Sequence, residues 1–146
     1  MDQTIQNFIS AKNLAVIGIS LKSKKFGNAV YETLKQKPYN VFPIHHRADA
    51  IGGNRTYRDI HSLPPEVDSV VVCLRPDKAA PALANIEKSG IKRVWLQQGA
   101  NFSEIEKELR KKGIETVSRK CILMYAAPVE GLHAFHRFIW KLLGKL

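Results

Sequence analysis

The chain has little cysteine, and it lacks a long apolar run. Only two of its 146 residues are cysteine, Cys73 and Cys121, which excludes the disulfide framework typical of small secreted domains. No uninterrupted apolar stretch reaches the roughly 20 residues that span a bilayer. The polar start, residues 1–12, has no signal-peptide core. We therefore predict a cytoplasmic protein without a membrane segment.

Acidic residues are also scarce. The chain has 13 Asp and Glu against 23 Lys and Arg, which gives a net charge of +10 and a pI near 9.8. Such an excess favours anionic partners, namely nucleotides, nucleic acid or an acidic membrane face. The alternative is a lysine-rich surface with no bound anion. Basic residues interleaved with aromatic ones, a pattern typical of RNA-binding surfaces, are not evident, so we do not expect a nucleic-acid partner.

The hydrophobic pattern predicts a single α/β domain over residues 1–146, with its core at 13–123. Hydrophobic residues make up 45% of the chain, and no linker or repeat divides it. Strands alternate with helices of about ten residues, which predicts a Rossmann-like three-layer fold: a parallel sheet of about five strands with helices on both faces. The expected strands are 14–19, 40–44, 67–74, 93–97 and 115–118, with a further short strand near 55–57; the expected helices are 2–10, 28–37, 76–89 and 103–112.

An extra C-terminal helix is expected over residues 131–143. Its apolar side chains recur at helical spacing, and basic residues lie between them. Such a helix packs on the sheet or on a second copy of the chain, in which case the protein is a homodimer. The alternative is a helix that lies on a membrane surface.

A phosphate-binding turn is predicted directly after the first strand. The apolar run ends in Gly18-Ile19-Ser20, a lysine-rich loop that includes Lys25 follows, and Gly27 opens a helical pattern. Backbone N–H groups at the start of a helix, together with its dipole, attract anions. The Rossmann fingerprint has a second glycine where Ser20 stands, so a plain tight turn is the alternative.

The end of the second strand distinguishes between nucleotide cofactors. NAD-binding proteins usually place Asp or Glu there to hold the ribose. This chain has His45, His46 and Arg47, and no acid before Asp49. The pattern argues against NAD and favours a phosphorylated ribose, as in NADP or coenzyme A; the alternative is a solvated loop. Arg75 follows a buried strand and could pair with phosphate or stack on adenine.

An ordered series of segments resembles the small bacterial CoA-binding proteins, whose domain is related to the CoA-binding domain of the succinyl-CoA synthetase alpha subunit. The resemblance covers about residues 13–123. The segments that carry it are 16–20 (VIGIS), 26–30 (FGNAV), 39–44 (YNVFPI), 52–57 (GGNRTY), 60–64 (IHSLP), 67–72 (VDSVVV), 74–76 (LRP), 94–99 (VWLQQG) and 118–121 (SRKC).

This resemblance implies a Rossmann-like domain that binds CoA or an acyl-CoA, with no catalysis established for the family in general. It places the diphosphate at the turn after the first strand, the adenosine between the ends of the second and third strands, and the pantetheine along the fourth. The cofactor-binding residues that it implies are Gly18, Ser20, Lys25, Phe26 and Gly27 for the diphosphate region, Pro43, His45, Leu74, Arg75 and Pro76 for the adenosine, and Gln98 and Gly99 for the pantetheine.

The chain departs from the family in two places. His45-His46 stand where the family often has Asn-Pro, and Lys120 stands where an arginine commonly precedes the late cysteine. Nothing near Cys121 in the sequence lowers its pKa, so we expect a structural thiol. His133 and His136 have a spacing that can chelate a metal, but only Glu130 lies close enough in sequence to add to them, and we predict no metal site.

No catalytic constellation is legible, so the sequence predicts a non-catalytic binding or regulatory module for a small nucleotide ligand. Two alternatives stay open. One is an NADP-dependent or CoA-dependent enzyme of unknown substrate. The other is a basic nucleic-acid-binding protein.

Overall fold

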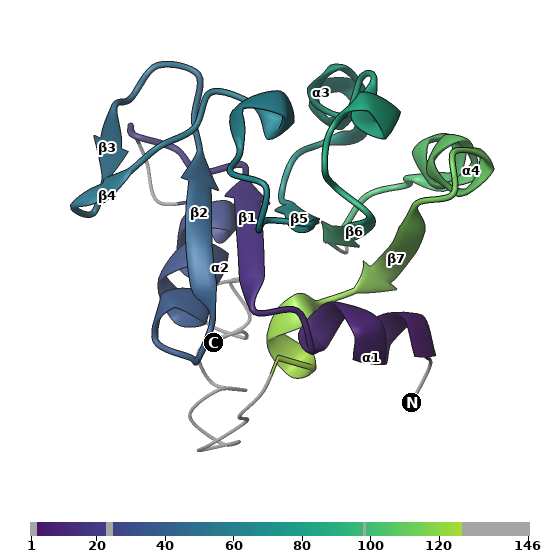
Figure 1. Ribbon diagram of the computed structural model, residues 1–146, viewed down its shortest axis with the longest axis horizontal. Coiled ribbons are helices and arrows are strands. Elements are labelled where there is room, and N and C mark those ends of the chain that lie inside the picture. The colour runs from purple at the N-terminus through teal and green to yellow at the C-terminus, as the bar shows by residue number, and fades with distance from the viewer. Residues whose placement is uncertain (1–2, 23–24, 98, 127–146) are drawn as a thin grey trace.

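The computed structural model describes residues 3–22, 25–97 and 99–126. Its centre is a five-stranded sheet in which every neighbouring pair is parallel (Figure 1). The strands, in spatial order, are β2 (Asn40–Ile44), β1 (Asn13–Ile17), β5 (Ser69–Val72), β6 (Arg93–Gln97) and β7 (Glu115–Lys120). The predicted Rossmann-like parallel sheet is confirmed.

Helices cover both faces of this sheet. One face packs against α1 (Gln3–Ile9), α2 (Phe26–Lys35) and the short 3₁₀ helix η3 (Ile122–Met124). The opposite face packs against α3 (Pro76–Ala82), α4 (Ser103–Lys111) and the 3₁₀ helices η1 (Ile60–Ser62) and η2 (Ile86–Lys88). None of the helices in the described ranges is long and apolar enough to cross a membrane.

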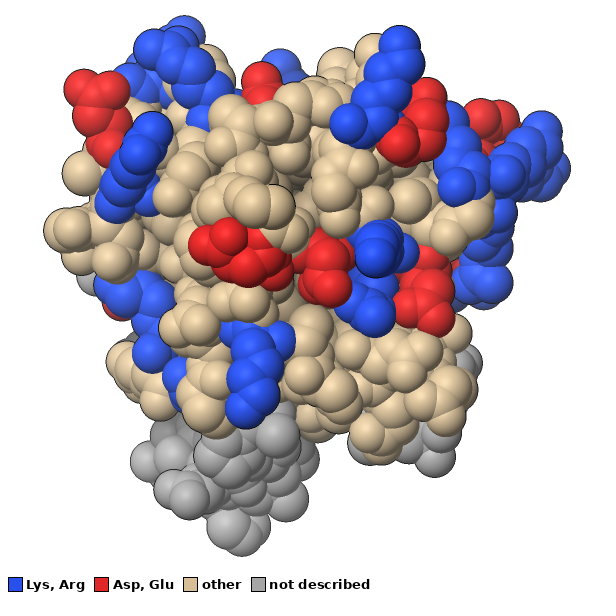
Figure 2. Space-filling view, in the orientation of Figure 1, with Lys and Arg blue, Asp and Glu red and all other residues tan. Residues whose placement is uncertain are grey.

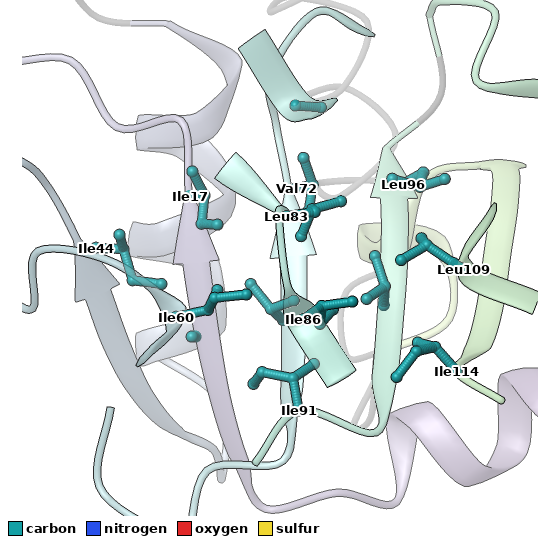
Figure 3. Packing of buried hydrophobic residues seen from close by; sticks show 14 of the residues in the cluster. Ile17, Ile44, Ile60, Val72, Leu83, Ile86, Ile91, Leu96, Leu109 and Ile114 are labelled. Carbon is teal, nitrogen blue, oxygen red and sulfur yellow. The ribbon is translucent and has the colours of Figure 1, made fainter. Parts of the chain in front are cut away.

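The central strands are apolar on both sides because both of their faces are covered. Val16, Val71 and Trp95 point into the core beneath α1 and α2. Their neighbours Ile17, Val72 and Leu96 point the other way, into the core beneath α3 and α4 (Figure 3). This alternation explains why each strand appears in the sequence as a nearly continuous hydrophobic run.

The strand order reverses between β1 and β5. From β1 the chain crosses to β2 on one side, and later returns to β5 on the other. In open parallel sheets, ligands bind beyond the carboxyl ends of the strands at such a point. The loops that follow β1, β2, β5 and β6 all begin at this carboxyl edge, so the topology brings the predicted site segments to one end of the sheet.

Two elements differ from the sequence-based expectation. The helix predicted over 76–89 ends at Ala82, because Pro81 lacks an N–H and Asn85 adopts a left-handed conformation with φ 57°. A hairpin of β3 (Ala50–Ile51) and β4 (Asn54–Arg55) stands where the sequence predicts a single short strand near 55–57. The helix predicted at 131–143 lies outside the described residues.

Candidate functional site

The turn after β1 packs against the end of β5. Gly18 has φ +113°, and a Cβ atom on it would lie 2.4 Å from the carbonyl oxygen of Cys73. The Cys73 N–H donates to the carbonyl of Ile17 at 2.8 Å. Only glycine fits at this close approach, which lies where the chain leaves β1 and the strand order reverses.

A second glycine brings α2 against the same turn. A Cβ atom on Gly27 would lie 2.1 Å from the carbonyl oxygen of Gly18 and 3.2 Å from the Cβ of Cys73. Gly27 is the second residue of α2, so the start of this helix sits directly on the turn. Close helix–strand packing of this kind is the role of the last glycine in the Rossmann fingerprint.

Asn28 fixes the shape of the turn. Its Oδ1 accepts hydrogen bonds from the N–H groups of Ser20, at 3.0 Å, and Lys25, at 3.2 Å. Its Nδ2 donates to the carbonyl of Ser20 at 2.8 Å. The Ser20 hydroxyl accepts from the N–H of Lys22 at 3.3 Å. The sequence analysis does not single out Asn28, although a polar amide in the third position of a helix is a recognisable capping signal.

The phosphate-binding turn predicted for this region lies at the start of α2. The helix begins at Phe26, two residues earlier than expected, and Lys25 is its N-cap. The first N–H groups of an α-helix have no intrahelical acceptor, and the helix dipole places partial positive charge there. Lys22 and Lys25 are exposed beside this end and add full charges.

The carboxyl end of β2 is formed by Pro43 and His45. Pro43 is buried on an edge strand, where its missing N–H is tolerated, and its carbonyl accepts from the N–H of Tyr57 at 2.9 Å. The His45 N–H donates to the carbonyl of Tyr57 at 2.8 Å. Tyr57 therefore extends the sheet at this edge, and the tilted pair of Phe42 and Tyr57 rings, 6.0 Å apart, supports it.

His45 is an acceptor in the folded protein. Its Nδ1 accepts hydrogen bonds from the N–H groups of Arg47, at 3.0 Å, and Ala48, at 3.1 Å, so Nε2 carries the proton. Its ring stacks on that of His46 with centroids 5.2 Å apart. Partial burial and the nearby His46 and Arg47 lower the pKa of His45. The sequence analysis counts His45 among the basic residues, but the structure makes it a neutral ring with one N–H donor at neutral pH.

The third predicted segment, residues 74–76, lies at the end of β5. Pro76 begins α3 and Arg75 is its N-cap, while Leu74 packs into the core beneath α3. The Arg75 side chain is 86% exposed, and its Nε lies 3.6 Å from the carboxylate of Asp77. An exposed guanidinium next to a carboxylate is only weakly held, so Arg75 is accessible to a ligand at this edge.

The fourth segment follows β6. Gly99 has φ +117°, which requires glycine, and Gln98 lies outside the described residues. Gln97, which precedes them, is 4% exposed; its Oε1 accepts from the N–H of Ile122 at 3.1 Å. Its Nε2 is buried and, in the part of the chain that the structure describes, has no hydrogen-bond partner. Gln97 belongs to the segment 94–99 that carries the family resemblance, but only its neighbours Gln98 and Gly99 are predicted as cofactor-binding residues.

Both cysteines lie on the α2 side of this edge. Burial raises the pKa of Cys73, and Cys121 raises it further. Burial also raises the pKa of Cys121, although the Gln97 side chain and the N–H groups of Leu123 and Met124 oppose that rise. Both groups are therefore protonated thiols at neutral pH, as a structural role for Cys121 requires.

A bulge in β7 brings Cys121 beside Gln97. Trp95 pairs with Val117 but Gln97 pairs with Lys120, and Arg119 between them has φ 63°. The Trp95 indole N–H donates to the carbonyl of Lys120 at 2.9 Å, which holds the bulged strand in place. Such bulges re-aim the residues that follow them.

A model of the CoA binding domain family matches residues 12–127. The chain belongs to this family. Among curated proteins, it is 26% identical over 126 residues to the alpha subunit of acetate–CoA ligase [ADP-forming] II from Pyrococcus furiosus, a match that covers 79% of the chain and 28% of the ligase subunit. It is 21% identical over 112 residues to the uncharacterized protein YneT of Bacillus subtilis, and there the match covers 77% of the chain and 83% of YneT.

Solved structures agree with this family membership. A conserved hypothetical protein from Pyrococcus furiosus has a TM-score of 0.70 and 32% identity, over 76% of this chain and 96% of that one. A hypothetical protein from Pyrococcus horikoshii, at 23% identity, has a TM-score of 0.76 over 86% of this chain and 89% of its own, and shows the same fold. The chain spans only 16–28% of the length of the ADP-forming CoA ligases that it matches.

Proposed function

We propose that these 146 residues bind coenzyme A or an acyl-CoA as a non-catalytic binding or regulatory module. The observation that carries the proposal is the start of α2. Gly27 places this helix end on the turn at the strand-order reversal, and Asn28 holds the turn in one shape. A preformed anion site at this position suits the diphosphate of a nucleotide, and the CoA binding domain family supports CoA as that nucleotide.

The residues around this turn fit such a ligand. Gly18 and Gly27 carry no side chain into the turn, so no Cβ atom at these two positions competes with a ligand for space. Lys25 is the charged residue next to the diphosphate. The neutral and partly exposed ring of His45, two residues after the buried Pro43, offers a stacking surface to adenine. The Gly99 turn after β6 is the proposed pantetheine end.

The proposal does not include a catalytic step. The two thiols are protonated at neutral pH, which leaves them poor nucleophiles. No group of three His, Cys, Asp or Glu side chains within the described ranges converges as a metal site would, and His133 and His136 lie outside those ranges. The ligases that the chain resembles are several times longer than it is. We therefore propose only the binding of CoA for these residues.

Calorimetric titration tests the proposal directly. We expect saturable binding of CoA to one site, and slow or no consumption of acetyl-CoA over hours. Oxidation of NADPH with simple carbonyl compounds would instead support an enzyme. Binding of single-stranded DNA that falls steeply with salt, without binding of CoA, would support a nucleic-acid-binding protein.

The surface charge favours the small ligand over a polyanion. On the face in Figure 2, the Lys and Arg side chains of the described residues form separate groups with acidic side chains between them. Nucleic-acid-binding surfaces usually gather basic residues on one face or along one helix. Through the face shown, we therefore expect DNA to bind weakly compared with a ligand that enters a shaped site.

A further inference from the structure

A cavity of about 330 Å³ lies next to the carboxyl end of β2, outside the residues predicted from the sequence. Arg55 and Arg58 line it, together with Asp49, Thr56 and Ser62. Arg55 ends β4 and Ser62 ends η1, and the other residues belong to the segments that join the hairpin to β2 and η1. The cavity therefore belongs to the end of the molecule that β3 and β4 form (Figure 1).

Backbone hydrogen bonds fix the cavity to the predicted adenosine site. Tyr57, which also lines it, donates its N–H to Pro43 at 2.9 Å and accepts at 2.8 Å from the N–H of His45. In open α/β sheets, the ribose of a bound nucleotide lies at the end of this second strand, and a nearby arginine can accommodate a phosphate on that ribose. Arg58 follows Tyr57 directly and Arg55 precedes it by two residues, so both arginines are close in sequence to the residue that pairs with the end of β2.

The charges of the cavity suit a phosphate group. In the residues that the structure describes, neither Arg55 nor Arg58 forms an ion pair with a carboxylate. The Arg55 guanidinium lies over the Tyr57 ring, 5.3 Å from its centroid, which orients it. The carboxylate of Asp59 is already bonded to the N–H groups of η1. Asp49 is the one acidic residue in the lining, and basic and acidic side chains appear together over this end in Figure 2.

Two of the cations expected to meet a ribose phosphate, His45 and Arg75, are less suited to it than this arginine pair. His45 is neutral because its Nδ1 accepts two backbone N–H groups, and its pKa is lowered. Arg75 belongs to the end of β5, and its guanidinium is next to Asp77. Planar guanidinium groups bind phosphate through paired hydrogen bonds, which the Arg55 and Arg58 pair is free to form.

We propose that Arg55 and Arg58 form a subsite for the phosphomonoester on the ribose of the bound nucleotide, which in CoA is the 3′-phosphate. This subsite rests on the proposed function, because the phosphomonoester is one part of the CoA ligand proposed there. The chemistry it names is a ribose phosphomonoester, which NADP also carries. The subsite makes the protein select CoA over dephospho-CoA, whereas the α2 turn binds the diphosphate that both share.

Calorimetric titration of CoA and dephospho-CoA into the unaltered protein and three variants tests the subsite. The variants are Arg55→Gln, Arg58→Gln and the control Lys107→Gln, which removes the same charge from the exposed face of α4 at the other end of the sheet. We expect each arginine variant to weaken CoA binding about tenfold or more. Dephospho-CoA affinity should stay unchanged, which also shows that the variants fold. The lysine variant should leave both affinities within about twofold.

A fourth variant changes the affinity in the opposite direction. Asp49→Asn removes the acidic group from the cavity lining, so it should strengthen CoA binding several-fold and leave dephospho-CoA binding as it was. Equal affinity of the unaltered protein for the two ligands would overturn the subsite but keep the proposed function. An equal loss of affinity for CoA and dephospho-CoA in the arginine variants would also overturn the subsite.

Titrations with NADP and NAD separate the two sources of the phosphate. If the protein binds NADP better than NAD through the arginines, and does not bind CoA, the phosphomonoester subsite stands while CoA is the wrong ligand. If none of the four nucleotides binds, both the subsite and the proposed function are overturned.

Discussion

Asn28 holds Ser20 by both ends of its amide: Oδ1 accepts from the Ser20 N–H at 3.0 Å, and Nδ2 donates to the Ser20 carbonyl at 2.8 Å. One side chain at the start of α2 thereby fixes the backbone at Ser20, shortly after the end of β1. The Lys25 N–H, 3.2 Å from the same Oδ1, joins the other end of the loop to it. Asn28 therefore holds Ser20 and Lys25 in place without a ligand.

Replacement of Asn28 by alanine should loosen this turn. Each hydrogen bond lost from a partly buried site costs about 1 kcal/mol, so we expect the free energy of unfolding to fall by about 1–3 kcal/mol. CoA affinity should fall about tenfold or more, because the ligand must then order the loop. Urea denaturation and calorimetry measure the two effects.

Asn40→Ala is the matched control for Asn28. Asn40 donates its amide to the Oδ1 of Asn13 at 2.9 Å, in an exposed pair at the amino ends of β1 and β2, opposite to the proposed site. Asn40→Ala should lower the free energy of unfolding by less than about 1 kcal/mol and leave CoA affinity unchanged. If Asn28→Ala binds CoA as tightly as the unaltered protein, the turn is not the diphosphate site.

Gly27→Ala should destabilise the fold even though alanine is the better helix former. The gain in helix propensity is about 1 kcal/mol. The added Cβ would lie 2.1 Å from the carbonyl oxygen of Gly18, and a backbone oxygen cannot move away as a flexible side chain can. Overpacking of this kind costs about 1–3 kcal/mol or more, so we expect a net loss in urea denaturation.

Gly90→Ala tests whether that loss comes from the contact. A Cβ atom on Gly90 would lie 3.9 Å from the carbonyl oxygen of Val67, which is an ordinary contact. Its effect on stability should stay within about 0.5–1 kcal/mol of zero. A Gly27→Ala variant as stable as Gly90→Ala would mean that α2 can move off the turn without cost.

Much of this fold could be predicted because its signals are local. Strands buried on both faces appear as nearly continuous apolar runs such as 70–72 in β5, and such a run is recognised without knowledge of its neighbours in the fold. Once alternating strands and helices give a parallel sheet, the carboxyl-end rule places the loops after β1, β2, β5 and β6 together. The location of the candidate site therefore follows from topology alone.

The features that the sequence does not show depend on contacts between distant segments. The left-handed Arg119 follows from the pairing of β6 with β7 and from the Trp95 indole bond, 25 residues away. The role of His45 depends on where its ring lies relative to two backbone N–H groups. The early end of α3 is different, because Pro81 is a local signal that the sequence itself contains. The helix predicted over 76–89 runs past this proline without a physical reason.

The stability of the protein should depend on the protonation of His45. Its pKa is lowered in the folded state from 6.5, mainly by burial, so the unfolded chain takes up the proton first as the pH falls. The stabilisation by neutral His45 is then complete above about pH 6.5 and is lost as the pH falls through the lowered pKa. Urea denaturation at a series of pH values from 7.5 to about 5 should show this loss.

His45→Gln separates this contribution from those of other groups. The difference in unfolding free energy between the unaltered protein and His45→Gln should shrink or change sign below about pH 6.5, because glutamine does not titrate. His46→Gln removes the neighbouring ring of the stacked pair and serves as the control for the loss of stacking. A difference that stays constant across this range would show that His45 does not carry the dependence.

The two thiols should react slowly with alkylating agents in the folded protein. The thiolate is the reacting species, and burial raises the pKa of both Cys73 and Cys121. We expect iodoacetamide at pH 7.5 to modify neither cysteine over a time in which both are modified in urea. Mass spectrometry of the Cys73→Ser and Cys121→Ser variants assigns each reaction to one residue. Rapid modification of Cys121 in the folded protein would contradict a structural role, since it would mean that the Gln97 amide and the η3 N–H groups outweigh the effect of burial and hold a reactive thiolate.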